Sequence, residues 1–104
     1  MAQTPEDKIK KQITDYVDLL EIKYNVPIMW ERRDASGLGY RKGRCDLFVV
    51  CNGVHIEVEV KTPKGSLSTM QETWQRYCVA NKIPHIVARS KEEFADQLLK
   101  IISS

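Results

Sequence analysis

The sequence predicts an α/β fold in which helices cover both faces of a mixed central sheet. The expected order is a helix, three strands, a helix, a strand and an extra C-terminal helix. Apolar residues recur at helical spacing in three segments, and β-rich runs lie between them, two of which flank Asn52-Gly53. Because one strand follows a helix that itself follows a strand, this order favours a parallel crossover within the sheet.

The first helix is expected to begin at Thr4, an N-cap residue followed by Pro5 and two acids. One apolar stripe then runs to about residue 23 and consists of Ile9, Ile13, Tyr16, Val17 and Leu20. Glu6 lies seven residues before Ile13 and so falls on this stripe, which faces the sheet. An acid in the first turn ordinarily stabilises the helix dipole, and a role in a site is the alternative.

Three strands should follow. Residues 26–32 are β-rich, with Pro27 suited to an edge or a strand start, and residues 34–43 contain three glycines and predict a loop. Asn52-Gly53 predicts a hairpin between residues 46–51 and 54–61. We expect Val50 to pair near Gly53 or Val54, and Asp46 to lie roughly opposite residue 59.

The second half of the chain should contain a helix, a strand and a helix. Ser68 and Gln71 form a capping box for a helix that ends near Asn81. Its expected buried face comprises Met70, Trp74, Tyr77 and Cys78. Residues 84–89 predict a buried strand, and Ser90 opens a second capping box before a helix that buries Phe94, Leu98 and Ile101.

The totals favour one intracellular, soluble domain over residues 1–104. The chain has 104 residues and a net charge of +2, and no apolar run approaches the ~20 residues of a membrane span. The odd cysteine count fits a reducing compartment, so Cys45, Cys51 and Cys78 are interpreted as small core residues. The remaining aromatic and histidine residues of interest are interpreted as ordinary strand, core or interface residues: Trp30, His55, Trp74 and His85.

A basic cluster occupies the middle third of the chain. Its members are Arg32, Arg33, Arg41, Lys42 and Arg44, interrupted by one acid, Asp34. A solvated loop and a nucleic-acid contact explain such a cluster equally well.

Acidic residues and a lysine alternate along the second hairpin strand. Strand periodicity places Glu57, Glu59 and Lys61 on one face, a pattern that a solvent-facing strand would also show. With Asp46 opposite residue 59, two carboxylates and a lysine form a compact cluster. Glu57 lies nearer the turn and is predicted to be a surface residue.

This cluster predicts metal-dependent phosphodiester hydrolysis. Paired carboxylates are stable around a hard cation, for which Mg²⁺ or Mn²⁺ is better suited than zinc. Such a cation accepts a phosphate oxygen as a further ligand. Lys61 can position or help to deprotonate the attacking water, or stabilise charge on the phosphate. Arg41, Lys42, Arg44 and Lys64 flank these residues and are expected to contact DNA phosphates.

The pattern resembles a known nuclease signature. Cys45-Asp46, twelve intervening residues and Glu59-Val60-Lys61 are similar to the PD-(D/E)XK motif. The run from Lys61 to Gln71 further resembles the VRR-Nuc family, whose pattern is K-x-P-x-G-x-L-S-x-x-Q. The match spans about residues 6–95 and implies a restriction-endonuclease-like αβββαβ core. Cys45 departs from the signature, which usually has proline there.

The resemblance implies roles for individual residues. Asp46 and Glu59 would be metal ligands, together with the backbone carbonyl of Val60, and Glu6 would be a ligand directly or through water. Lys61 would be catalytic, and Gln71 an active-site polar group.

Stand-alone VRR-Nuc members are similar to dimeric Holliday-junction resolvases and are typically viral or bacterial. We therefore expect a homodimeric, structure-selective DNA endonuclease of repair or recombination, acting on four-way junctions in a bacterial cytoplasm or a phage-infected host. A flap, nicking or restriction-like nuclease is one alternative, and a non-catalytic DNA-binding module is another.

Overall fold

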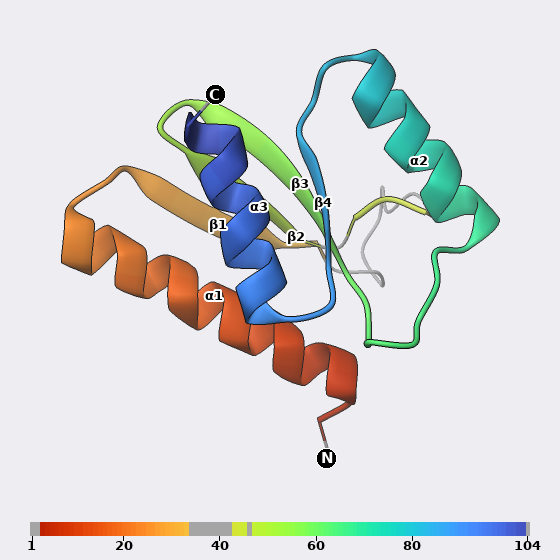
Figure 1. The fold of residues 1–104 in the computed structure, drawn as a ribbon, viewed down its shortest axis with the longest axis horizontal. Coiled ribbons are helices and arrows are strands. Elements are labelled where there is room, and N and C mark those ends of the chain that lie inside the picture. Colours follow the sequence, from red (N-terminus) through yellow and green to blue (C-terminus); the bar gives the residue numbers. More distant parts are fainter. Residues whose placement is uncertain (1–2, 34–42, 46, 104) are drawn as a thin grey trace.

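The computed structural model describes residues 3–33, 43–45 and 47–103. Its elements follow the predicted order and confirm the α/β class (Figure 1). The helices are α1 (Pro5–Tyr24), α2 (Thr69–Ala80) and α3 (Lys91–Ser103), and the strands are β1 (Ile28–Arg32), β2 (Leu47–Cys51), β3 (Val54–Val60) and β4 (His85–Ala88).

The sheet is mixed, with the strand order β1-β2-β3-β4. The first three strands are antiparallel, and β4 runs parallel to β3 after the crossover through α2. Val50 pairs with His55, so the expected pairing with Gly53 or Val54 is wrong. Asn52 and Gly53 both have positive φ, and they alone form the turn that Cys51 and Val54 close. Asp46 lies outside the described residues, and its pairing stays a prediction.

Proline shortens the first strand. The predicted strand began at residue 26, whereas β1 begins at Ile28, because Pro27 has no N–H to give to a ladder. Its carbonyl still accepts a hydrogen bond from the Asn52 N–H at 2.9 Å. The end of the hairpin is thereby fixed against the start of β1.

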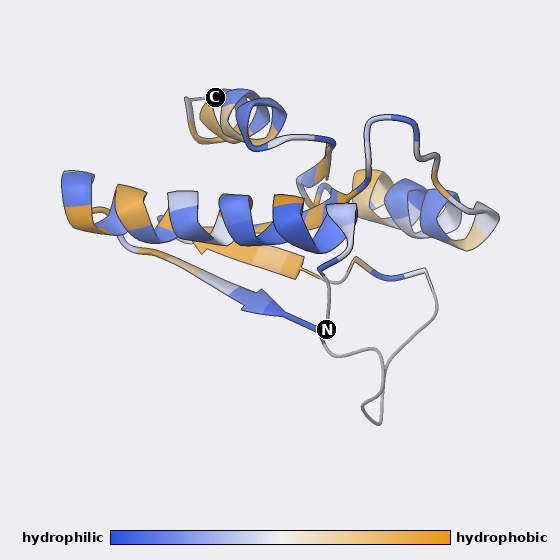
Figure 2. Ribbon diagram, turned by 90° about the horizontal axis from the view of Figure 1, so that it is seen from below, coloured by the Kyte–Doolittle hydropathy of each residue, from blue (hydrophilic) through white to orange (hydrophobic). Residues whose placement is uncertain are grey.

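One face of the sheet packs against α1 and α3, which lie together over it (Figure 1). Tyr16 of α1 meets Phe94 of α3 edge to face, with ring centroids 6.3 Å apart. Hydrophilic and hydrophobic residues alternate along the helices, as expected where one side is buried (Figure 2). The central core residues are Ile13, Val17, Leu47, Val49, Ile56, Val58, Val60, Ile86, Phe94 and Leu98.

The third helix, α2, stands apart from α1 and α3, beyond β4 (Figure 1). It contacts β4 and the face of β3 that points away from the core. Helices therefore cover both faces, as predicted. The expected buried face of α2 is wrong in part, since Met70 and Tyr77 are exposed while Cys78 is buried. Because α2 meets the sheet at one edge, only a narrow stripe of the helix surface is buried.

The predicted helix caps are largely confirmed. The Thr4 hydroxyl accepts from the Asp7 N–H, and both halves of the Ser68–Gln71 capping box form. The Ser90 hydroxyl accepts from the Glu93 N–H, but the Glu93 carboxylate accepts from the Arg89 N–H rather than from Ser90. All three cysteines are buried and free, as expected. Within the described ranges, no helix is long and apolar enough to cross a membrane.

Candidate active site

The Glu59 carboxylate lies at the centre of the candidate site. Glu59 is only 4% exposed, on the face of β3 that α2 covers. Its Oε1 accepts a hydrogen bond from Gln71 Nε2 at 2.7 Å, and Lys61 Nζ stands 4.0 Å from the same oxygen. Three residues that the sequence proposed for the site therefore come together.

Gln71 has two contacts that use opposite ends of its amide. Its Oε1 accepts from the Ser68 N–H at 2.9 Å, which completes the capping box, while its Nε2 donates to Glu59. The Ser68 hydroxyl in turn accepts from the Gln71 N–H at 3.2 Å. The residue that completes the N-terminal cap of α2 thus also donates to the Glu59 carboxylate.

The connection between Lys61 and Ser68 is anchored to the end of β4. The Lys61 N–H donates to the Ala88 carbonyl, and Arg89 Nη2 donates to the Gly65 carbonyl at 2.9 Å. Lys64 lies exposed on this connection, where a phosphate could reach it. The sequence reasoning missed Arg89, because a single arginine after a strand gives no signal of such a contact.

Glu6 lies in the first turn of α1, at the end of the molecule where β3 also ends (Figure 1). Its carboxylate is 36% exposed and pairs with Lys10 Nζ at 3.4 Å. Lys10 is only 7% exposed and was overlooked at the sequence level. The signal was present, since Lys10 lies three residues before Ile13 and seven before Val17, on the stripe that faces the sheet.

The prediction that Glu57 is a surface residue is wrong. Glu57 is 3% exposed and binds Arg33 through both carboxylate oxygens, at 2.6 and 2.8 Å. His55 Nε2 also contacts it. Burial alone would raise the pKa of the Glu57 carboxyl, but the hydrogen bonds from Arg33 and His55 outweigh it and lower the pKa.

Cys45 and His85 lie beside this pair. Cys45 Sγ is 3.3 Å from His85 Nε2, and His85 pairs with Glu57 across the β3–β4 ladder. Burial, followed by the charges of Glu59 and Glu57, raises the pKa of the Cys45 thiol far above its usual range. A thiol held in its protonated form is a poor nucleophile, so Cys45 is a packing residue.

Of the four residues predicted to contact DNA, Arg44 and Lys64 fall in the described ranges, whereas Arg41 and Lys42 lie outside them. The Arg44 guanidinium lies over the Trp74 ring, 5.3 Å from its centroid. Gly43 has φ +91°, and an added Cβ would come within 2.6 Å of the Met70 carbonyl oxygen. The chain that leads toward residue 46 therefore packs closely against the first turn of α2.

Comparison with solved structures identifies this arrangement of elements. No family model matches the sequence, and no curated protein matches it either. A solved structure described as a VRR_NUC domain superimposes with a TM-score of 0.73 and 21% sequence identity, over 94% of this chain and 97% of that chain. The chain has the fold of a VRR_NUC domain. The resemblance seen in the sequence is thus confirmed at the level of the fold.

The residues that the sequence proposed as metal ligands all offer oxygen donors. Those in the described ranges are the carboxylates of Glu59 and Glu6 and the carbonyl of Val60, and oxygen is the donor that Mg²⁺ and Mn²⁺ prefer. Within residues 3–33, 43–45 and 47–103, no three His, Cys, Asp or Glu residues form a group that could hold a metal. Asp46, the other proposed carboxylate ligand, lies outside those ranges.

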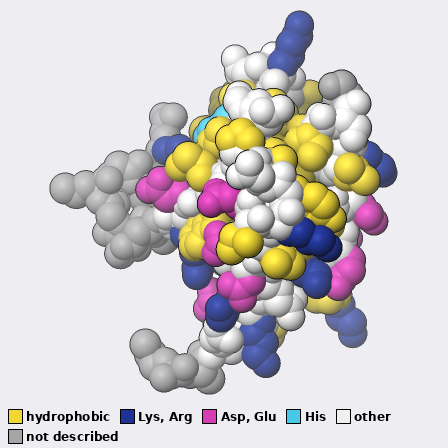
Figure 3. Space-filling view, turned by 90° about the vertical axis from the view of Figure 1, so that its left-hand side faces the viewer, with side chains coloured by type: hydrophobic (Ala, Val, Ile, Leu, Met, Phe, Trp, Pro, Cys, Tyr) yellow, Lys and Arg dark blue, Asp and Glu magenta, His cyan; other side chains and the backbone are white. Residues whose placement is uncertain are grey.

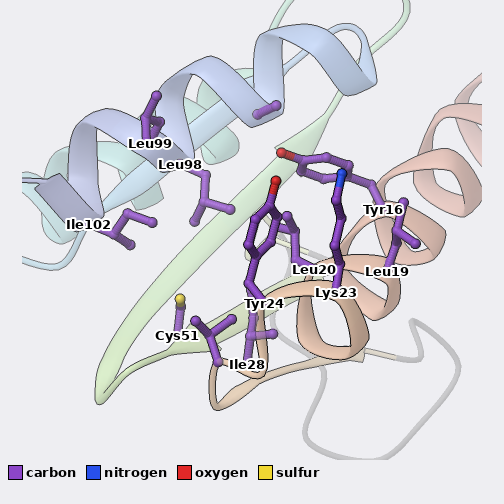
Figure 4. Close-up of a pocket in the computed structure, with 12 residues that line it drawn as sticks. Tyr16, Leu19, Leu20, Lys23, Tyr24, Ile28, Cys51, Leu98, Leu99 and Ile102 are labelled. Atoms are coloured by element: carbon purple, nitrogen blue, oxygen red, sulfur yellow. The ribbon is translucent and has the colours of Figure 1, made fainter.

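A separate apolar cavity of about 400 Å³ lies between the C-terminal half of α1 and α3 (Figure 4). Tyr16, Leu20, Tyr24 and Leu98 are among the side chains that line it. The face at that end of the molecule shows hydrophobic side chains among charges of both signs (Figure 3). Glu59, Lys61 and Gln71 do not line this cavity, so it is distinct from the candidate active site.

Proposed function

We propose that the chain is a metal-dependent nuclease that hydrolyses phosphodiester bonds in DNA, with its active site at Glu59, Lys61 and Gln71. The observation that supports this most is the buried Glu59 carboxylate, which accepts from Gln71 and faces Lys61 at 4.0 Å. A buried carboxylate is costly unless it is hydrogen-bonded and compensated by positive charge. The VRR_NUC fold and the lysine 4.0 Å from this carboxylate support a catalytic role for Glu59.

The bound metal would be Mg²⁺ or Mn²⁺, held by Asp46, Glu59, the Val60 carbonyl and Glu6, the last directly or through water, and it would polarise the scissile phosphate. Gln71 orients the Glu59 carboxylate. Lys61 is placed to hold the attacking water or to stabilise negative charge on the phosphate, both of which act chiefly in the transition state.

The DNA backbone would be held by basic residues around this site. Lys64 is exposed beside the end of β3, and Arg44 stacks on Trp74 at the start of the chain toward Asp46. Arg41 and Lys42, which lie outside the described residues, are proposed to add further phosphate contacts. Contacts of this kind position the backbone without reading sequence, so we propose selection by DNA structure.

The preferred substrate in this proposal is a four-way (Holliday) junction, cut by a homodimer. A junction is resolved by two cuts on separate strands, and a two-fold dimer supplies two equivalent sites. The activity would serve DNA repair or recombination in a bacterial cytoplasm or a phage-infected host. A flap, nicking or restriction-like nuclease is the alternative within the same chemistry.

The test compares labelled four-way junctions, flaps and linear duplexes, each with Mg²⁺, with Mn²⁺ and with chelator. We expect cleavage only with metal, and faster cleavage of the junction. Equal rates on all three substrates would reject the junction preference and leave the nuclease proposal standing. Binding without cleavage of any substrate would instead support the non-catalytic DNA-binding alternative. The same assay applied to Glu59→Ala tests the proposed ligand. Glu92→Ala, which removes an exposed acid of α3, is the matched control for that variant.

Light scattering from the same preparation, coupled to size exclusion, measures the oligomeric state. A dimeric mass at the concentration used for cleavage is expected. A monomer that still cuts both strands of the junction would contradict the two-site scheme.

A further inference from the structure

A partly buried arginine lies close to the candidate active site without belonging to it. Arg33 follows β1, its side chain is 17% exposed, and it pairs with Glu57, which is 3% exposed. The guanidinium meets both carboxylate oxygens, with Nη1–Oε1 at 2.6 Å and Nη2–Oε2 at 2.8 Å. It also lies over the Phe48 ring, 4.9 Å from the centroid. Two parallel hydrogen bonds and a stacked ring fix the plane of the guanidinium.

The same guanidinium holds the backbone directly before Asp46. Arg33 Nη1 donates to the Cys45 carbonyl oxygen at 2.6 Å, in addition to its bond with Glu57. Arg33 therefore ties together the chain after β1, the chain that leads into β2, and β3. Proline, which the PD-(D/E)XK signature usually has at this position, would restrict φ through its ring, whereas at Cys45 the hydrogen bond from Arg33 restrains the peptide group.

Stability alone does not account for this arrangement. A buried ion pair is commonly no more stabilising than an apolar pair of the same volume, because both charges lose their hydration. Unlike an apolar side chain, the guanidinium that binds Glu57 has a further N–H group that can donate to a backbone carbonyl. That carbonyl belongs to the residue next to a proposed metal ligand. Glu57, which orients the guanidinium, lies two residues from Glu59 on the same face of β3.

We propose that Arg33 is a positioning residue of the active site. Oriented by Glu57, it fixes the carbonyl of Cys45, the residue that precedes the proposed ligand Asp46, and so restrains the backbone that leads into the metal site proposed at Glu59. The inference rests on the proposed function, since it assigns Asp46 and Glu59 to one metal. Groups that orient metal ligands from outside the coordination shell typically change metal affinity by about 10–100-fold when they are lost.

The test is Arg33→Lys, measured by calorimetric titration of Mn²⁺ into the protein without DNA. Lysine keeps the charge beside Glu57 but cannot bind both carboxylate oxygens and the Cys45 carbonyl in one plane. We expect Mn²⁺ affinity to fall about tenfold or more. In cleavage assays, the Mn²⁺ concentration for half-maximal rate should rise by the same factor, while the rate at saturating Mn²⁺ changes much less.

Arg32→Lys is the matched control. Arg32 is the neighbouring residue, carries the same charge and pairs with Asp7 of α1 at 3.5 Å, in an exposed position. Its replacement should leave Mn²⁺ affinity unchanged. If Arg33→Lys lowers the melting temperature but binds Mn²⁺ as the wild type does, Arg33 is merely structural and the inference is overturned.

Glu57→Gln provides a second route if Arg33→Lys does not fold. It preserves the size of the side chain but removes the charge that orients the guanidinium, so Mn²⁺ affinity should fall in the same direction. Unchanged affinity in a folded Glu57→Gln protein would overturn the inference. A wild-type protein that binds no Mn²⁺ would reject the proposed function and this inference together, whereas wild-type binding with unaffected variants would reject this inference alone.

Discussion

The two faces of β3 are both buried, yet they are built from opposite chemistry. Ile56, Val58 and Val60 are fully buried against α1 and α3, where burial itself is favourable. Glu57 and Glu59 are almost as deeply buried on the other face, where each charge must be compensated by a partner. The apolar face stabilises the fold, whereas burying the charged groups of the other face lowers the free energy of unfolding.

The two carboxylates of the polar face differ in turn. Glu57 forms an ion pair with the planar guanidinium of Arg33, at 2.6 Å. Glu59 instead accepts a hydrogen bond from the neutral amide of Gln71 and lies 4.0 Å from Lys61 Nζ, on a flexible side chain. The first arrangement suits a fixed structural contact. The second arrangement is less rigid, as the proposed binding of a metal and a phosphate would require.

Glu59→Ala should produce the largest effect, at least about a thousandfold loss of cleavage rate, because it removes a proposed metal ligand. DNA binding at low salt should be retained or tightened, since a negative charge is lost. Cleavage kinetics and fluorescence anisotropy on the same junction measure the two effects. Full metal-dependent cleavage by the variant would reject Glu59 as a ligand.

Ile56→Ala probes the apolar face of the same strand. It should lower the free energy of unfolding by about 2–5 kcal/mol, because it leaves a cavity in a fully buried site. Urea denaturation measures this change. At a temperature where the variant stays folded, its cleavage rate should match the wild type, and a large loss of rate would show that the two faces are not separable.

Gln71→Glu should have an intermediate effect. A glutamate oxygen can still accept from the Ser68 N–H, so helix α2 keeps its cap, but the amide donor to Glu59 is replaced by a negative charge. We expect a cleavage rate about tenfold or more below the wild type, with helix content unchanged by circular dichroism. Wild-type rates would remove Gln71 from the active site and leave it as a helix cap.

His85→Gln should have the smallest effect, visible only as a change in pH dependence. Burial lowers the pKa of His85 below its ordinary 6.5, partly opposed by the charge of Glu57, so the folded protein favours the neutral ring. Below pH 6.5 the unfolded chain binds a proton that the folded chain resists, and wild-type stability falls. The slope contributed by one group is at most about 1.4 kcal/mol per pH unit.

Urea denaturation near pH 7.5 and again near pH 5.5 tests this. The wild type should lose more stability on acidification than His85→Gln. Equal losses would mean that the ring titrates normally in the folded protein.

The sequence predicted the features that local chemistry decides. Asn52-Gly53 located the hairpin, and the Ser68–Gln71 box located α2, because both depend on residues close in the chain. It failed for Glu57, since alternation identifies residues that share a face but not whether another element covers that face. The partner is Arg33, 24 residues away in the chain, in a cluster that the sequence could equally assign to solvent. Whether Asp46 joins Glu59 stays a prediction.

The double contact of Gln71 links the candidate active site to the folding of helix α2. Helix α2 is attached chiefly at one edge of the sheet, with Cys78 its only buried residue, so hydrogen exchange should find it among the least protected of the three helices. Each local opening of its first turn would release the Glu59 carboxylate while the β1–β3 core persists. Heating should therefore reduce activity before the main unfolding transition, and a DNA-bound complex should slow exchange in α2 first.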